Sequence, residues 1–163
     1  MFKKFYPDKK FTSINEITAE FFAENNIEYA LLDIDNTLVA YTKPVADENA
    51  KAFLKMLERC GISYAFVSNN HKDRVKKFAA EFDAFFVHDS GKPLLFGVKK
   101  AMRRLGAKKE NTCLIGDQVF TDVYAGKRAG LLTIMVDPIE AKETPFFGVK
   151  RYFERIVLKN YGK

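Results

Sequence analysis

The residues best suited to chemistry in this sequence are two aspartates one residue apart, Asp33 and Asp35, in the segment DIDNT. A carboxylate can attack an electrophile, transfer a proton or bind a hard cation such as Mg²⁺. Three further polar segments follow along the chain and add a serine hydroxyl, a lysine ammonium and two more aspartates. They are SNN at 68–70, GKP at 91–93 and GDQVFTD at 116–122. Such a set could hold a phosphate group, whose negative charge repels a nucleophile unless cations offset it.

Each segment taken alone also has a purely structural explanation. Paired aspartates after a strand are often turn or cap residues, and Ser-Asn-Asn is a common loop sequence. Lys92 before Pro93 could simply begin a helix, and the aspartates of the last segment could cap one. The four segments in this order, each expected at a strand end or a helix start, favour one shared site.

The elements that must position these residues alternate along the chain. Short apolar runs that are continuous rather than alternating predict strands covered on both faces, at 29–33, 63–68, 84–87, 112–116 and 132–136. Helical spacing falls between them at 45–59, 72–81, 94–105 and 120–129, and also at 14–25, with Ser13 as N-cap, and at 145–161. Strand alternating with helix predicts an α/β fold with a doubly wound parallel, Rossmann-like sheet in three α/β/α layers.

Ligands of an open parallel sheet bind beyond the carboxyl ends of the strands, where the strand order reverses. The four polar segments should therefore meet at one edge of the sheet. The 163 residues suit a single domain, 1–163, with a core at about 28–137 and flanking helical segments. The intervals 39–67 and 71–91 each hold one helix and one strand, which leaves no room for a separate cap domain.

The ordered set DIDNT, SNN, GKP and GDQVFTD resembles the four signature motifs of the haloacid dehalogenase (HAD) superfamily. The length of the chain and the wording of its motifs are similar to those of the small subfamily IIIA phosphatases called YqeG-like. The resemblance covers about 29–136. It implies a Mg²⁺-dependent phosphatase, with a HAD-like fold, that acts on a phosphorylated substrate.

The resemblance also implies roles for individual residues. Asp33 would bind metal and attack phosphorus to form an aspartyl-phosphate, while Asp35 would serve as general acid and base and bind metal through its backbone carbonyl. Asp117 and Asp122 would complete the metal site. The remaining expected site residues are Ser68 and Lys92, which contact the phosphoryl group, Thr37, which braces the loop, and Asn69, whose amide lies beside the phosphate. Asn36 stands where many relatives have Gly, and Asn tolerates unusual backbone angles.

Composition sets the broader limits. A net charge of +6 and a pI near 9.2 favour an anionic partner, which could be a phosphorylated substrate, nucleic acid or acidic lipid. The sequence holds no recognised RNA motif, so nucleic acid is disfavoured. Cys60 and Cys113 form no CxxC pair, which indicates reduced thiols. No signal segment or bilayer-spanning run is present, so we expect a cytoplasmic protein. The sequence leaves the oligomeric state open.

An uncovered site could accept phosphate carried on something large, such as a lipid, a protein or a nucleic acid. Both ends of the chain interleave aromatic and basic residues, and Phe146, Val149, Phe153 and Ile156 fall at helical spacing. This pattern is typical either of a helix packed on the core or of one at an anionic membrane surface, here the inner face of the membrane. Eukaryotic relatives of the subfamily include phosphatidylglycerophosphate phosphatases, so this phospholipid is the leading candidate substrate by resemblance.

Other interpretations stay open from the sequence alone. The chain could be a catalytically silent phosphate-binding scaffold, or it could act on a phosphoprotein, a nucleic acid or a small sugar phosphate. A silent scaffold is disfavoured because the sequence keeps all of the main residues expected for catalysis: Asp33, Asp35, Ser68, Lys92 and Asp117. His71, which follows SNN, could contact a leaving group or be an exposed loop or cap residue, and His88, at the end of the third strand, could be an ordinary surface residue. The sequence leaves the roles of both open.

Overall fold

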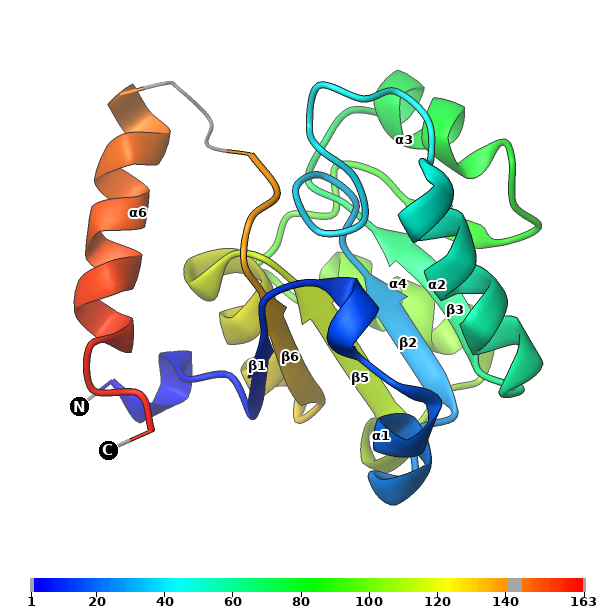
Figure 1. The fold of residues 1–163 in the computed structure, drawn as a ribbon, viewed down its shortest axis with the longest axis horizontal. Coiled ribbons are helices and arrows are strands. Elements are labelled where there is room, and N and C mark those ends of the chain that lie inside the picture. The colour runs from blue at the N-terminus through cyan, green and yellow to red at the C-terminus, as the bar shows by residue number, and fades with distance from the viewer. Residues whose placement is uncertain (1, 141–144, 163) are drawn as a thin grey trace.

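The structure, a computed structural model, describes residues 2–140 and 145–162. Its centre is a sheet of six parallel strands in the order β1-β6-β5-β2-β3-β4 (Figure 1). The strands are β1 (Lys9–Phe11), β2 (Tyr29–Leu32), β3 (Ser63–Val67), β4 (Phe85–Val87), β5 (Thr112–Gly116) and β6 (Leu132–Val136). The predicted doubly wound parallel sheet is confirmed. The order reverses between β2 and β5, so the carboxyl ends of these two strands border the crevice expected to bind a ligand.

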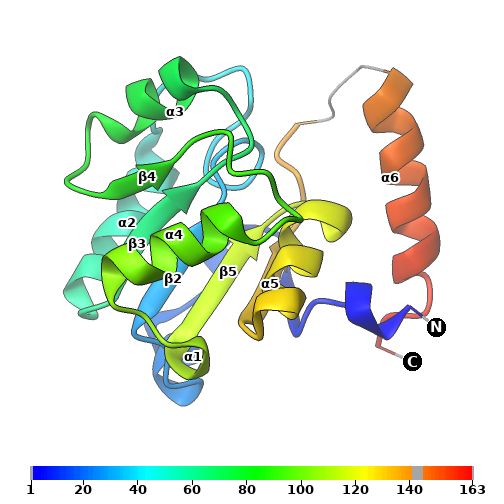
Figure 2. The ribbon, with the colours of Figure 1, turned by 180° about the vertical axis from the view of Figure 1, so that it is seen from behind.

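Helices cover both faces of the sheet, which gives the three layers predicted (Figures 1 and 2). One face packs against α1 (Ala19–Glu24), α2 (Glu48–Arg59) and α3 (Lys72–Ala79), and the other against α4 (Phe96–Leu105) and α5 (Tyr124–Ala129). A π-helical turn, Val119–Val123, leads directly into α5. The interval 39–67 contains only α2 and β3, and the interval 71–91 only α3 and β4, so neither holds an additional domain.

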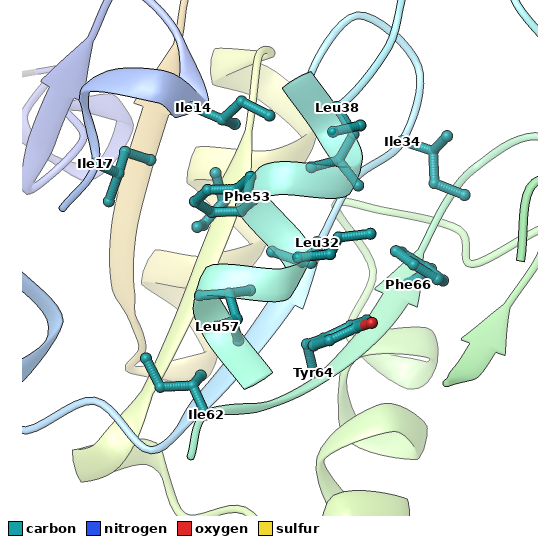
Figure 3. Packing of buried hydrophobic residues seen from close by; sticks show 14 of the residues in the cluster. Ile14, Ile17, Leu32, Ile34, Leu38, Phe53, Leu57, Ile62, Tyr64 and Phe66 are labelled. Carbon is teal, nitrogen blue, oxygen red and sulfur yellow. The ribbon is translucent and has the colours of Figure 1, made fainter. Parts of the chain in front are cut away.

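The larger hydrophobic core lies under α2. Phe53 and Leu57 of this helix belong to the same cluster as Leu32 of β2 and Phe66 of β3, and all four side chains are buried (Figure 3). Apolar positions of α2 recur every three or four residues, which places them on one helix face. This packing fixes β2 and β3, and with them the positions of the polar residues that follow each strand.

The last helix, α6 (Pro145–Leu158), stands beyond the β1 edge of the sheet and beside the N-terminal segment (Figures 1 and 2). Its buried residues are Glu154 and Val157. The apolar residues at helical spacing are exposed instead, up to 72% for Phe146. Of the two interpretations of this pattern, packing of that face on the core is therefore wrong. None of the helices in the described ranges combines the length and the hydropathy that a membrane span requires.

Two predicted details near the N-terminus were wrong. The helix expected at 14–25 is a short 3₁₀ turn followed by α1, and Thr18 rather than Ser13 caps the α-helix by accepting a hydrogen bond from the Phe21 amide at 3.3 Å. Strand β1 was not predicted at all. Its sequence, KKF, has no apolar run, and it becomes a strand because its backbone pairs with β6 at the sheet edge.

Candidate active site

The four polar segments meet at the carboxyl edge of the sheet, as predicted. They line a cavity of about 470 Å³ together with residues of α6. Asp33 and Asp35 enter it from the end of β2, Ser68 from the end of β3, and Lys92 from the segment before α4. A larger cavity of about 720 Å³ lies at the opposite edge of the sheet, away from the four segments.

Three buried carboxylates form the centre of the site. Asp33, Asp117 and Asp122 each place an oxygen within 4.8 Å of the others. Asp122 reaches this point from the π-helical turn, and Gly116 makes room for it: a Cβ at Gly116 would overlap the Asp122 carboxyl group. Asp35 is not part of this carboxylate group, although its side chain lines the same cavity.

Lys92 holds two of these carboxylates together. Its ammonium group donates to Asp33 Oδ1 at 2.9 Å, to Asp122 Oδ1 at 2.7 Å and to the Val67 carbonyl at 2.6 Å, so all three protons are used. The Asn69 side chain fixes the backbone of Lys92 on both sides, accepting from its amide and donating to its carbonyl, each at 2.8 Å. The lysine is therefore pre-positioned by the second polar segment.

The Thr37 hydroxyl contacts the carboxylate of Asp33 within its own loop, which fits the expected bracing of that loop, and also contacts Asp117. It lies 3.2 Å from Asp33 Oδ2 and 3.4 Å from Asp117 Oδ1, and it does not line the cavity. Asn36 has φ of 63°, in the left-handed region, and its side chain pairs with the backbone of Glu140. The tolerance of Asn for this conformation is thus used in the turn.

Asp35 is held by two residues that the sequence analysis did not single out. Arg74 of α3 donates to Asp35 Oδ1 and Asn70 donates to Asp35 Oδ2, each at 2.9 Å. Arg74 also donates to the Pro44 carbonyl at 3.0 Å. Asn70 belongs to the SNN segment with Ser68 and Asn69, so its position in the sequence could have indicated a role in the site. Nothing in the sequence around Arg74 indicated such a role, because only the packing of α3 brings this residue to the loop after β2.

The C-terminal helix supplies the second group that the sequence analysis missed. Arg151 forms an ion pair with Asp117 Oδ2 and donates to the Asp117 carbonyl at 2.9 Å. Glu154 accepts a hydrogen bond from the same guanidinium nitrogen, Nη1, at 2.8 Å, and another from the Val119 amide at 3.0 Å. Arg151 lies 34 residues after Asp117, and no spacing pattern links the two.

The electrostatics of the site suit a divalent cation. Burial is the largest influence on both Asp33 and Asp117, and together with the neighbouring carboxylates it raises the pKa of Asp33 to about 8 and that of Asp117 to about 6, although Lys92 and Arg151 oppose it. Clustered buried carboxylates are costly as anions unless positive charge offsets them. Their hard oxygen atoms are the donors that a divalent metal ion prefers, so the donor set fits such an ion.

The two histidines remain apart from this centre. His71 lines the cavity but is exposed and lies 3.3 Å from Asp89, while His88 lies 2.7 Å from the same carboxylate. Asp89 has a positive φ of 44°. Both histidines therefore contact the turn at Asp89 rather than the three central carboxylates.

Comparison with known proteins agrees with this geometry. The model of the haloacid dehalogenase-like hydrolases matches residues 20–130. The chain belongs to this family. It is 35% identical over 159 residues to the "Probable phosphatase YqeG" of Bacillus subtilis (strain 168), covering 97% of this chain and 92% of that protein.

One further relative and one solved structure are less similar to this chain. One is "Phosphatidylglycerophosphate phosphatase 1, chloroplastic/mitochondrial" of Arabidopsis thaliana, 27% identical over 128 residues, which span 71% of this chain and 36% of that protein. A structure from Legionella pneumophila assigned to HAD subfamily III A aligns with a TM-score of 0.56 at 15% identity, over 86% of this chain and 87% of that one. This protein is a HAD-type phosphatase, and its substrate carries a phosphate group.

Proposed function

We propose that this phosphatase hydrolyses phosphomonoesters with Mg²⁺ through an aspartyl-phosphate formed on Asp33. The observation that carries this proposal is the group of Asp33, Asp117 and Asp122 around one point, with Lys92 bonded to two of them. Mg²⁺ bound by these carboxylates and by the Asp35 carbonyl would offset the charge of the phosphate and that of the nucleophile.

The two carboxylates of DIDNT have different roles, Asp33 as the nucleophile and Asp35 as the general acid and base. An oxygen of Asp33 attacks phosphorus, and the bond from phosphorus to the ester oxygen breaks as Asp35 gives that oxygen a proton. Asp35 then takes a proton from the water that attacks the aspartyl-phosphate, which releases phosphate and restores Asp33. The bonds from Arg74 and Asn70 fix the position of Asp35 for both steps.

The remaining site residues bind and orient the phosphoryl group. The Ser68 hydroxyl and the backbone amide of Asn69 lie at the end of β3, at the wall of the cavity, where they can donate to phosphoryl oxygens. Lys92 balances the charge gathered there. The contacts of Thr37 with Asp33 and Asp117 support a role exerted through these carboxylates rather than on the phosphate directly.

For the substrate we propose a phosphate borne on a lipid, with phosphatidylglycerophosphate as the leading candidate. An apolar groove of about 690 Å³ lies next to the catalytic cavity, and Phe146 and Lys150 line both. The other groove residues come from α6, from the N-terminal segment and from the π-helical turn: Phe2, Phe5, Phe120, Val149, Phe153, Ile156 and Val157. A fatty acyl chain fits such a lining, and one relative is named for this substrate.

The same features support a location in the cytoplasm with attachment to the inner face of an anionic membrane. The exposed apolar face of α6 could lie at the lipid boundary, and the net charge of +6 would favour acidic headgroups. Co-sedimentation with vesicles of phosphatidylglycerol at low salt tests this proposal. Failure to co-sediment would remove it.

The catalytic proposal is tested with an aryl phosphate. Hydrolysis should require Mg²⁺, stop with EDTA and fall by roughly 10³-fold or more in Asp33→Asn, because the nucleophile is lost. Circular dichroism should show that the variant keeps its fold. Activity that survives in Asp33→Asn would contradict the assignment of the nucleophile.

The substrate proposal needs a separate comparison. We expect the highest kcat/KM for phosphatidylglycerophosphate in a panel that also holds a phosphopeptide, a mononucleotide and a sugar phosphate. A clear preference for one of the soluble compounds would reject the lipid while leaving the phosphatase mechanism in place.

A further inference from the structure

Apart from Arg74, which is ion-paired with Asp35, three basic side chains among the described residues surround the catalytic centre, and one of them differs from the others in its partners. Lys92 is ion-paired with Asp33 and Asp122, and Arg151 with Asp117 and Glu154. The positive charges of these two residues are thus already matched by carboxylates.

The third cation, Lys150, has no such match. Its ammonium group donates to the side-chain oxygen of Gln118, a neutral amide. Within the described parts of the chain, no carboxylate oxygen lies within 4.0 Å of it, the distance that defines the ion pairs of the other two. Lys150 therefore presents a positive charge that an anion could still bind.

The position of Lys150 is also distinctive. Lys150 lines both the catalytic cavity and the apolar groove, so it stands where the two meet. Its side chain is half-buried, and burial is the main reason why the pKa of Lys150 lies below its usual value despite nearby acidic groups. A partly desolvated ammonium group gains more from an anionic partner than one in open water.

We propose that Lys150 binds a second anionic group of the substrate, a phosphodiester placed between the phosphomonoester and an apolar chain. This inference rests on the proposed phosphatase function and deepens its substrate class. The order of features along the cavity matches the order within such a molecule: reactive phosphate at Asp33, diester at Lys150 and hydrocarbon in the groove beyond. A lipid whose phosphomonoester joins the hydrocarbon part directly lacks the middle group and makes no use of Lys150.

The test compares three substrates in the full-length enzyme with Mg²⁺, in micelles of neutral detergent. They are phosphatidylglycerophosphate, phosphatidic acid, which has no diester, and p-nitrophenyl phosphate. In Lys150→Gln, the ratio of kcat/KM for phosphatidylglycerophosphate to that for phosphatidic acid should fall about tenfold, since a charge-assisted hydrogen bond is lost. Lys150→Arg should recover most of this ratio because it keeps the charge.

Arg155→Gln is the matched control. It removes one positive charge from the same helix at an exposed position that lines neither cavity, so it should leave the ratio as it is. An equal fall in Arg155→Gln would show general attraction to anionic lipid and overturn the inference. An unchanged ratio in Lys150→Gln would also overturn it.

The proposed function and this inference can fail separately. If the unmodified enzyme hydrolyses p-nitrophenyl phosphate but neither lipid, the phosphatase mechanism stands and the role of Lys150 is rejected. If p-nitrophenyl phosphate is not hydrolysed, the catalytic proposal itself fails, and the inference fails with it.

Discussion

The edge of the sheet and the C-terminal helix contribute to the same site in opposite ways. At the sheet edge, Asp33, Lys92, Asp117 and Asp122 are all buried, and Lys92 is ion-paired with Asp33 and Asp122. Helix α6 leaves most of its apolar face in solvent and is attached through Arg151, Glu154 and a small cluster around Val157. Reactive groups must be held rigidly, whereas a substrate-contacting surface can be set on a peripheral element.

This difference suggests a division of labour. Changes at the sheet edge should lower turnover of every substrate, because they act on the phosphoryl group. Changes on α6 should act either on the Asp117 carboxylate or on substrates with a hydrocarbon chain. Variants of the two regions should therefore differ in which substrates they affect.

Asp35→Asn should reduce kcat by about 10²- to 10⁴-fold for aryl and lipid phosphates alike, because the amide cannot carry a proton between leaving group and water. Steady-state kinetics with both substrates measures this, with Mg²⁺ binding checked by calorimetry. Asp73→Asn, which changes an exposed aspartate of α3 that does not line the catalytic cavity, serves as control. Full activity in Asp35→Asn would remove Asp35 from the chemistry.

Arg151→Ala should weaken Mg²⁺ binding by about 10- to 100-fold, because Asp117 loses the guanidinium that orients its carboxylate and supports its charge. Calorimetric titration with Mg²⁺ alone measures this without relying on activity. Arg151→Lys should show a smaller loss of Mg²⁺ affinity, since it keeps the charge but cannot contact both the side chain and the carbonyl of Asp117 as the guanidinium does. Tighter binding in Arg151→Ala would mean that the arginine competes with the metal.

Phe153→Ser should raise KM for phosphatidylglycerophosphate by about fivefold, because apolar area in the groove is lost, and should change the aryl phosphate little. Tyr152→Ser removes an exposed aromatic residue from the same helix outside the groove. If both variants raise KM equally, the helix contacts lipid as a surface and the groove has no separate role.

Asp8→Asn should lower the free energy of unfolding by about 1 kcal/mol at pH 7. Asp8 accepts from the amide and the hydroxyl of Thr133, each at 2.8 Å, and pairs with Lys127, so it ties the N-terminal segment to β6. Partial burial alone would raise the pKa of Asp8, but these hydrogen bonds outweigh it and hold the pKa below its usual value.

The sign of the pH dependence follows from that lowered pKa. The Asp8 carboxylate contributes its stability above its unfolded pKa of about 3.9 and loses it as pH falls through the lower folded value. Urea unfolding of Asp8→Asn and of the unmodified protein should therefore differ at pH 7, begin to converge as the pH falls below about 4, and coincide only below the lowered folded pKa. A difference that persists in acid would point to packing rather than charge.

Much of the architecture could be predicted because the central strands are continuous apolar runs with helical segments between them. The five predicted strands lie within one residue of those observed. Strand β1 could not be predicted, since Lys9 and Lys10 have no apolar pattern and depend on pairing with β6. The break before α1 was missed because Thr18 and Ser13 are equally good caps in the sequence.

The sequence by itself determined which residues gather at the sheet edge. Each of the four polar segments follows a strand or begins a helix, so parallel topology alone carries them to one place. Only the tertiary structure decided that Arg74 holds Asp35, that Arg151 holds Asp117 and that Lys150 lies where a polar cavity meets an apolar groove. These contacts join helices to strands far away in the chain, and their geometry depends on how whole elements pack, which no local spacing encodes.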